Sequence, residues 1–304
     1  MKIVDGKILV SKLRIYVIYG NDKYGPYDKI DDLQYDDIDD LQYDEKDYLQ
    51  FSPDGKTLAC KAKRKGKLYV ISGNAEYGPY DVKDYMEYLH LEFSPDGKTL
   101  VYKVKINGKY YVISGNDKYG SYDDIRDLEF SPDGKTLAYS VRIDDKKYVI
   151  SGNDKYGPYD YIYDLQFSPD GKTLVYKAEI DGKLYVISGN DKYGPYDYIN
   201  DLQYDELDYL KFSPDGKTLV YKAKIKGKWY VISGKEKYGP YDYEYEIYDL
   251  QFSPDGKTLV YVVKIDGKHY VISGNDKYGP YDGIGYLQFS PDGKTLAYKV
   301  KINK

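Results

Sequence analysis

Short apolar runs separated by polar turns follow one another along the whole chain. Between residues 164 and 199 the pattern is typical of four strands, with the sequences DLQFS, KTLVYKAEI, KLYVIS and KYGPYDYI. The turns between them carry strong signals, because SPDG supplies a fixed φ at Pro and a left-handed φ at Gly, while DGK and SGND pair Gly with an Asx residue. The pattern predicts an all-β chain built from short hairpins.

The second and third of these strands are apolar on both faces, as in Leu174, Val175 and Tyr176. Strands of this kind need cover on both sides of their sheet. The fourth strand contains Pro195, which cannot donate to a ladder and therefore belongs on an edge. We expect four-stranded sheets that stack on one another, with the fourth strand outermost.

Two sequence markers repeat along the chain and alternate without a miss. FSPDGK occurs seven times, starting at Phe51, Phe93, Phe130, Phe167, Phe212, Phe252 and Phe289. YG(P/S)YD also occurs seven times, starting at Tyr24, Tyr77, Tyr119, Tyr156, Tyr193, Tyr238 and Tyr278. Units that cannot cover themselves and repeat at this spacing predict a seven-bladed β-propeller with four antiparallel strands per blade, forming one domain over residues 1–304.

The chain ends predict how the ring closes. Residues 287–302 supply a first and a second strand, whereas residues 15–18 and 24–28 supply a third and a fourth. Together they complete the seventh blade, so that the N-terminal strands close the ring and no edge stays free. Residues 1–11 are left over. The segment DGKILVSKLR, residues 5–14, resembles a second strand and is either an extra strand or a vestigial segment.

Composition narrows the function. The chain has 43 Tyr. Its net charge of −5 disfavours nucleic-acid partners, because these require a clustered basic face. The sequence contains no apolar run that spans a membrane and no signal peptide, and the compartment stays unknown. Cys60 is the single cysteine, and Asp36, Asp37, Asp39 and Asp40 lack the spacing of a calcium loop. We expect no metal and no cofactor.

The residues FSPDGKTLAY and the following YVIS resemble the TolB-like, WD-repeat-like propeller family over nearly the whole chain. The Trp-Asp pair of true WD repeats is absent, since Trp229 is followed by Tyr230. The resemblance implies a scaffold for protein interactions. The near-identity of the repeats indicates either recent amplification of a tandem repeat or a designed protein.

All length variation falls in one connection, from the fourth strand of a repeat to the first strand of the next. The spacing from the last Asp of YG(P/S)YD to the next Phe ranges from 7 to 23 residues. Loops that vary on a fixed scaffold often carry recognition, and tyrosines give contact area at little entropic cost. The alternative interpretation is solvated spacers. The predicted ligand-binding residues are Tyr35, Tyr43, Tyr48, Tyr85, Tyr88, Tyr204, Tyr209, Tyr243 and Tyr245.

A second candidate site is an axial channel lined by the first strands. Three residues before the Phe of each repeat stand polar or aromatic side chains that would form a ring at the channel mouth: Tyr48, His90, Asp127, Asp164, Tyr209, Asp249 and Tyr286. The competing hypothesis is that these are strand-entry residues bonded to neighbouring turns.

No spacing of Ser, His and Asp in the sequence suggests catalysis, and the recurring aspartates read as structural. We therefore expect a monomeric, non-catalytic scaffold that binds a protein or peptide through the face of inserted loops. Two alternatives are a Tyr-rich, carbohydrate-binding lectin and a structural or designed propeller with no ligand.

Overall fold

The computed structural model describes residues 2–4, 7–9, 15–19, 22–27, 29–30, 49–80, 91–199 and 210–303. These residues are strands and turns, with a single 3-10 turn, η2 (Glu244–Glu246), as their helical element. The predicted all-β class is confirmed. The chain has two compact units, an N-terminal unit (residues 1–126 and 141–145) and a C-terminal unit (residues 127–140 and 146–304).

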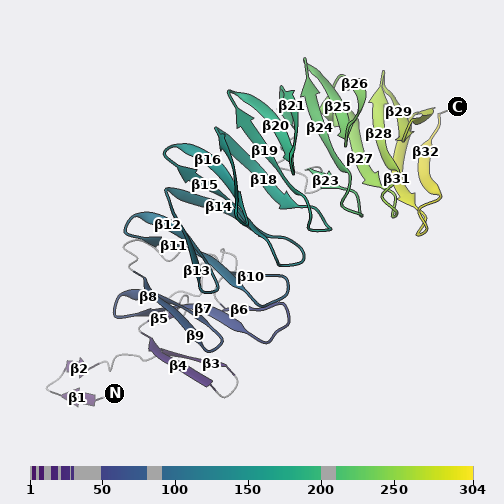
Figure 1. Cartoon of the computed structure of the whole chain (residues 1–304). Helices are drawn as coiled ribbons and strands as arrows, with labels where there is room; N and C mark the ends of the chain where they lie inside the picture. The colour runs from purple at the N-terminus through teal and green to yellow at the C-terminus, as the bar shows by residue number, and fades with distance from the viewer. Residues whose placement is uncertain are drawn as a thin grey trace. The chain divides into compact units, whose positions relative to one another are not determined.

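The four-stranded sheets are meanders whose strands pair in sequence order, as Figure 1 shows. In the sheet of β18 (Tyr161–Phe167), β19 (Leu174–Ile180), β20 (Lys183–Ser188) and β21 (Asp191–Tyr196), every pair is antiparallel. These are the four strands expected from the sequence, and β21 with its proline lies at the edge. The unit is a four-stranded antiparallel meander.

The strands repeat this order in the other sheets. The first strands are β6 (Leu49–Phe51), β10 (Leu91–Phe93), β14 (Asp124–Phe130), β23 (Lys211–Phe212), β27 (Ile247–Phe252) and β31 (Gly283–Phe289). The second strands are β7 (Leu58–Arg64), β11 (Leu100–Ile106), β15 (Leu137–Ile143), β24 (Leu219–Ile225), β28 (Leu259–Ile265) and β32 (Leu296–Lys301). The third strands are β3 (Ile15–Tyr19), β8 (Lys67–Ser72), β12 (Lys109–Ser114), β16 (Lys146–Ser151), β25 (Lys228–Ser233) and β29 (Lys268–Ser273). The fourth strands are β4 (Asp22–Tyr27), β9 (Ala75–Tyr80), β13 (Asp117–Tyr122), β17 (Asp154–Tyr159), β26 (Glu236–Tyr241) and β30 (Asp276–Tyr281).

Two sheets depart from four strands because their first strand is in two pieces. Strand β5 (Lys29–Ile30) and β6 both pair with β7, and β22 (Tyr198–Ile199) and β23 both pair with β24. The long insertions lie between the two pieces in the sequence. In these two sheets the two pieces together take the place of the first strand, beside the second, third and fourth strands.

The chain ends form separate two-stranded sheets. Strand β3 pairs with β4, and β31 pairs with β32. Strands β1 (Lys2–Val4) and β2 (Lys7–Leu9) form a hairpin in which Val4 faces Lys7. Within the segment of residues 5–14 the structure describes residues 7–9, which are one arm of this hairpin.

The turns follow their predicted chemistry. Asp181 and Gly182 have φ angles of 51° and 68°, as a two-residue type I′ hairpin requires. In the SPDG turn, the buried Ser168 hydroxyl donates to Asp170 Oδ1 at 2.6 Å and accepts from the Thr173 amide at 2.9 Å. The bond from Ser168 is the main cause of the lowered pKa of Asp170. The same bonds recur in the other FSPDGK turns that the structure describes.

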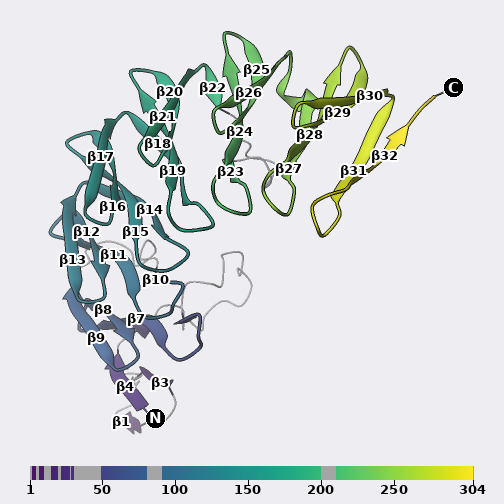
Figure 2. The same ribbon diagram turned by 45° about the vertical axis from the view of Figure 1, so that its right-hand side comes forward.

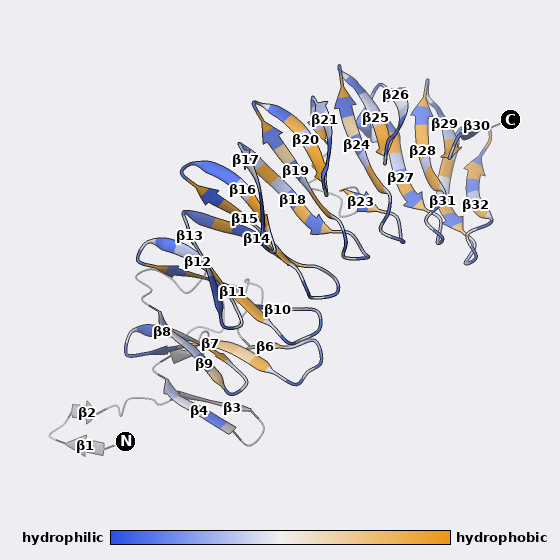
Figure 3. Ribbon diagram, viewed as in Figure 1, coloured by the Kyte–Doolittle hydropathy of each residue, from blue (hydrophilic) through white to orange (hydrophobic). Residues whose placement is uncertain are grey.

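The cores lie between successive sheets, where the middles of the second strands are apolar (Figure 3). Val175 and Val186 of one sheet pack with Leu219 and Tyr221 of the next. The Tyr196 hydroxyl lies 2.8 Å from the Tyr221 hydroxyl. Equivalent tyrosine pairs link other successive sheets, namely Tyr80–Tyr102, Tyr159–Tyr176, Tyr241–Tyr261 and Tyr281–Tyr298.

Every sheet has two different ends, which Figure 2 lets the reader follow along β18 to β21. We name the end with the SPDG and SGND turns the turn end. The other, the connection end, holds the two-residue turns between second and third strands and the links to the next sheet. Because all pairs are antiparallel, the variable insertions belong to the connection end.

Candidate functional site

Four of the aspartates that close YG(P/S)YD motifs, Asp123, Asp160, Asp197 and Asp282, join neighbouring sheets at the connection end. Asp160 accepts from Lys146 Nζ at 2.9 Å and from the Asp181 amide of the next sheet at 2.8 Å. The bond from Lys146 and then that from Asp181 lower the pKa of Asp160. Asp123 and Asp282 make the same two kinds of contact. These recurring carboxylates are therefore used in holding the structure together.

Stacked pairs of tyrosines lie exposed at the same end of the C-terminal unit. The rings of Tyr243 and Tyr245 have centroids 5.2 Å apart and are within 18° of parallel. Their side chains are 54% and 74% exposed, which is unusual for aromatic rings. Tyr161 and Tyr163 form a second pair, with centroids 6.1 Å apart and an interplanar angle of 12°. Such flat aromatic surfaces are suited to binding another molecule.

The tyrosine that follows the closing aspartate is also exposed in the sheet between these two pairs. Tyr198 is 40% exposed and its ring meets the edge of Trp229, with centroids 5.8 Å apart. In the next sheet, the Tyr248 hydroxyl lies 2.8 Å from His269 Nδ1. Sequence reasoning did not single out Tyr161, Tyr163 and Tyr198, because they lie outside the long insertions. Their signal was the aromatic residue after YGPYD.

Most of the predicted binding tyrosines lie outside the described residues. This group is Tyr35, Tyr43, Tyr48, Tyr85, Tyr88, Tyr204 and Tyr209. The two that are described, Tyr243 and Tyr245, lie at and within η2, in the connection between β26 and β27. The structure thus places this part of the predicted site on an exposed connection.

The residues expected to line an axial channel lie at a bulge in the first strands. Asp127, Asp164, Asp249 and Tyr286 all have φ between 53° and 55°, and His90 lies outside the described residues. The strand register shifts there, for example between Tyr163 and Gln166.

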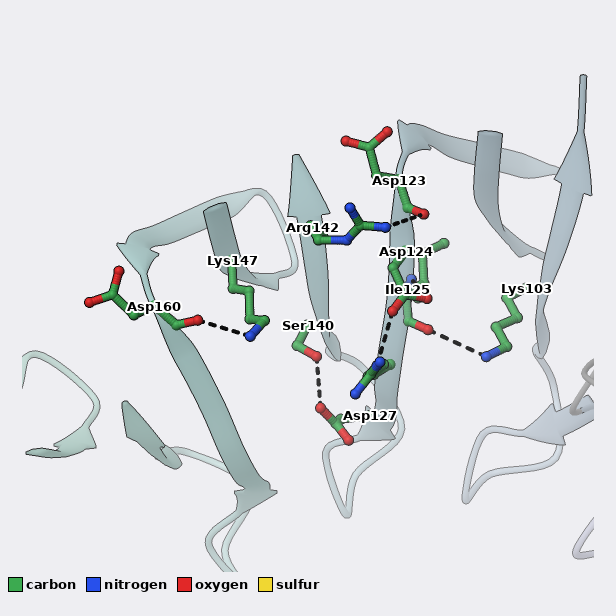
Figure 4. Close-up of polar contacts among 10 residues, drawn as sticks. Lys103, Asp123, Asp124, Ile125, Asp127, Ser140, Arg142, Lys147 and Asp160 are labelled. Carbon is green, nitrogen blue, oxygen red and sulfur yellow. Dashed lines mark hydrogen bonds and ion pairs between the residues drawn. The ribbon is translucent and has the colours of Figure 1, made fainter. Parts of the chain in front are cut away.

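Two of these aspartates contact the second strand of their own sheet. Asp127 Oδ2 accepts from the Ser140 hydroxyl at 2.7 Å, and Asp164 forms an ion pair with the buried Lys177 (Figure 4 shows the first contact). Asp127 and Asp164 are therefore held by the second strand of their own sheet, whereas the competing hypothesis named neighbouring turns.

The connection end of the sheet of β14 to β17 carries further contacts of basic side chains. Lys147 Nζ donates to the Asp160 carbonyl at 2.9 Å and lies 3.4 Å from the centroid of the Tyr161 ring. Arg142 donates to the Asp123 carbonyl at 3.4 Å, as Figure 4 shows. The side chains of this cluster contact backbone carbonyls and each other, which fits a role in joining the sheets.

A cavity of 370 Å³ lies at the turn end, between the sheet of β18 to β21 and the sheet of β22 to β26. The first sheet contributes the turn between β20 and β21, with Asn190, Asp191 and Tyr193. The second contributes Phe212 and Lys217. The sequence pattern does not predict this cavity, because its lining comes from two repeats and consists of residue types that recur along the chain.

Neither a metal centre nor a membrane span is evident in the part of the chain that the structure describes. No three His, Cys, Asp or Glu side chains of the described ranges form a metal-binding group. Among the same residues no helix is long and apolar enough to cross a bilayer.

Among known proteins, similarity to this chain is found in solved structures. No family profile and no curated protein matches the sequence. Similar solved structures include "Crystal structure of the eukaryotic initiation factor" (15% identity, 82% of this chain and 70% of that one, TM-score 0.44). Others are TolB from Acinetobacter baumannii (14%, 84% and 63%, TM-score 0.31) and the propeller domain of the Trilobed protease from Pyrococcus furiosus (14%, 86% and 91%, TM-score 0.35).

Proposed function

We propose that the chain is a non-catalytic propeller scaffold that binds a protein or peptide through the connection end of its sheets. The stacked, exposed pair of Tyr243 and Tyr245 carries this proposal. A rigid aromatic pair offers apolar area while losing little side-chain entropy on binding. The equivalent pair of Tyr161 and Tyr163 extends the same kind of surface to a second connection.

Selection from a random peptide library displayed on phage tests this proposal. Peptides selected on the intact chain are measured again on the double variant Tyr243→Ser, Tyr245→Ser. We expect affinity to fall at least about tenfold, as for interface hot spots. The matched control is Tyr119→Ser, which removes a 41% exposed tyrosine of a fourth strand and should leave affinity unchanged. Equal binding by the double variant would refute the proposal.

The proposal includes a closed ring in which β3 and β4 complete the blade of β31 and β32. The register of β3 on β4 pairs Val17 with Tyr24, as Val271 pairs with Tyr278 in a complete sheet. The register of β31 on β32 pairs Phe289 with Leu296, as Phe252 pairs with Leu259. Each end of the chain therefore carries one half of a blade, and pairing of β32 with β3 removes two free edges.

The remaining parts of the proposal come from the sequence. The FSPDGK repeat is similar to that of TolB-like propellers, and the near-identity of its copies is explained by recent amplification or by design. The net charge of −5 argues against nucleic acid. Closure of the ring would pair the free edges of β3 and β32 within one chain, so we propose that the protein is a monomer. The structural contacts of the recurring aspartates support a role other than catalysis.

A further inference from the structure

The cavity at the turn end has the size of a small-molecule site. Its volume of 370 Å³ falls in the range of about 300–1,000 Å³ that is typical of ligand pockets. It lies within the C-terminal unit, between two sheets packed through a common core. It is also at the opposite end of the sheets from Tyr243 and Tyr245, so it is separate from the proposed peptide surface.

The lining combines aromatic rings with both donors and acceptors. Phe212 and Tyr193 offer partly buried rings, while Asn190 and Asp191 supply amide and carboxylate groups. The Tyr193 hydroxyl donates to Asp191 Oδ2 at 3.4 Å. Desolvation, followed by the charge of Asp191, raises the pKa of Tyr193, so that its hydroxyl keeps its proton and stays a donor.

The charges of the lining do not favour an anionic ligand. Lys217 Nζ lies 3.6 Å from Asp215 Oδ2, so its charge is already compensated. Asp191 adds a carboxylate that would repel an anion. Aromatic faces beside a carboxylate and an amide suit a neutral ring that carries hydroxyl groups, because its C–H face packs on the rings while the hydroxyls bond to the polar groups.

The same residues recur in the sequence one repeat earlier and two repeats later within the C-terminal unit. Asn153, Asp154 and Tyr156 precede Phe167 and Lys172 at the spacing of the repeat, and Asn275, Asp276 and Tyr278 precede Phe289 and Lys294. One repeat differs, since Lys235 and Glu236 replace the Asn and the Asp. The chain thus contains its own comparison between matching and altered positions.

We propose that this cavity binds a neutral sugar of monosaccharide size, with Tyr193 and Phe212 contacting the ring and Asp191 and Asn190 bonding its hydroxyls. The equivalent positions with the same residues form further sites, and the position with Lys235 and Glu236 is impaired. Several weak sites on one chain would bind a surface coated with sugar far more tightly than a free sugar.

Saturation-transfer NMR with the full chain and the methyl glycosides of glucose, galactose, mannose and N-acetylglucosamine tests the proposal. We expect transfer to at least one glycoside at millimolar concentration. Replacing the five aspartates of the GND turns by alanine, namely Asp22, Asp117, Asp154, Asp191 and Asp276, should reduce the affinity at least about tenfold, since each loses a charge-assisted bond. Asp145→Asn at the connection end, whose side chain is 96% exposed, is the matched control and should bind as the intact chain does.

A second variant tests the opposite direction and does not depend on the fivefold variant folding. Restoring the repeat with Lys235→Asn and Glu236→Asp should increase capture on a surface coated with the bound sugar. The double variant Tyr243→Ser, Tyr245→Ser should keep full sugar binding, which separates this proposal from the peptide proposal. Absence of transfer to all four glycosides, or equal binding by the intact chain and a folded fivefold variant, would overturn it.

Discussion

The turn end and the connection end of the sheets differ in how their residues are held. At the turn end, a buried serine such as Ser168 bonds both a carboxylate and a backbone amide, and the same bonds recur from sheet to sheet. At the connection end, the recurring contacts come from one aspartate, such as Asp160, and the side chains around it vary. The turn end therefore keeps the same contacts from sheet to sheet, whereas the connection end keeps its recurring aspartate contacts and varies in the side chains around them.

Alanine in place of glycine should separate the two ends most strongly. At the turn end, a Cβ on Gly216 would lie 2.9 Å from Asp170 Cγ, at a φ of +73°. At the connection end, Gly227 has a φ of +79° and nothing within 4 Å. We expect Gly216→Ala to lower the free energy of unfolding by about 3 kcal/mol and Gly227→Ala by about 1 kcal/mol. Urea unfolding measures both, and equal losses would contradict the difference between the ends.

The serine of the turn should have the next largest effect. Ser168→Ala leaves the Thr173 amide and the Asp170 carboxylate without their buried partner, which should cost about 1–2 kcal/mol. Adding Asp170→Ala should then cost little more, because the two residues act together. Thermal unfolding of the single and double variants measures this. Additive losses would show that the turn is not held in this way.

Glu129, near the turn end, cannot make a hydrogen bond that glutamine makes at the same position in other repeats, so replacing it should stabilise the fold. Gln166 Nε2 donates to the Leu210 carbonyl at 2.7 Å, and Gln251 Nε2 donates to the Leu287 carbonyl at 3.2 Å. Glu129 occupies the same position of the repeat, and burial raises its pKa. An ionised carboxylate cannot donate such a bond, so Glu129→Gln should stabilise the fold by about 0.5–1 kcal/mol at neutral pH.

The pH dependence of this gain has a definite sign. A group whose pKa is raised on folding stabilises the fold below its unfolded pKa, and that contribution is lost as the pH rises through the folded pKa. The advantage of Glu129→Gln should therefore shrink when the pH falls below the ordinary pKa of 4.5. Melting temperatures of both proteins over an acidic pH series check this, and a constant difference would contradict the assignment.

The smallest effect on stability is expected at the connection end. Tyr243→Ser together with Tyr245→Ser removes two exposed rings that stack on one another. The free energy of unfolding should change by no more than about 0.5 kcal/mol, as is usual for surface positions. The melting temperature should therefore change little. A larger loss of free energy of unfolding would mean that the two rings stabilise the fold, which would contradict a role in binding alone.

The repeat pattern of the sequence was sufficient to predict the strands and turns. The two-residue turn at Asp181 and Gly182 and the edge position of the strand with Pro195 are where the local residue types place them. Local signals dominate there because each turn needs a particular φ.

Features that depend on more than one sheet were not predictable in this way. The buried Lys177 sits in a strand that reads as apolar, and its ion pair with Asp164 depends on a bulge that the pattern does not show. The turn-end cavity needs Asp191 from one sheet and Phe212 from the next. The aromatic pair at Tyr243 depends on η2, a local turn inside an insertion.

Disulfide formation between the two chain ends tests the proposed closure of the ring, in which β32 pairs with β3. In a complete sheet Val262 pairs with Val271, and the equivalent residues of the half blades are Lys299 and Val17. Paired strands bring Cα atoms to about 5.5 Å, which a disulfide spans. Val17→Cys with Lys299→Cys, in a Cys60→Ser background, should oxidise to a monomer with one internal disulfide. The shifted pair Val17→Cys with Lys301→Cys should oxidise far more slowly. A disulfide that forms only between chains, or equal rates for the two pairs, would contradict closure.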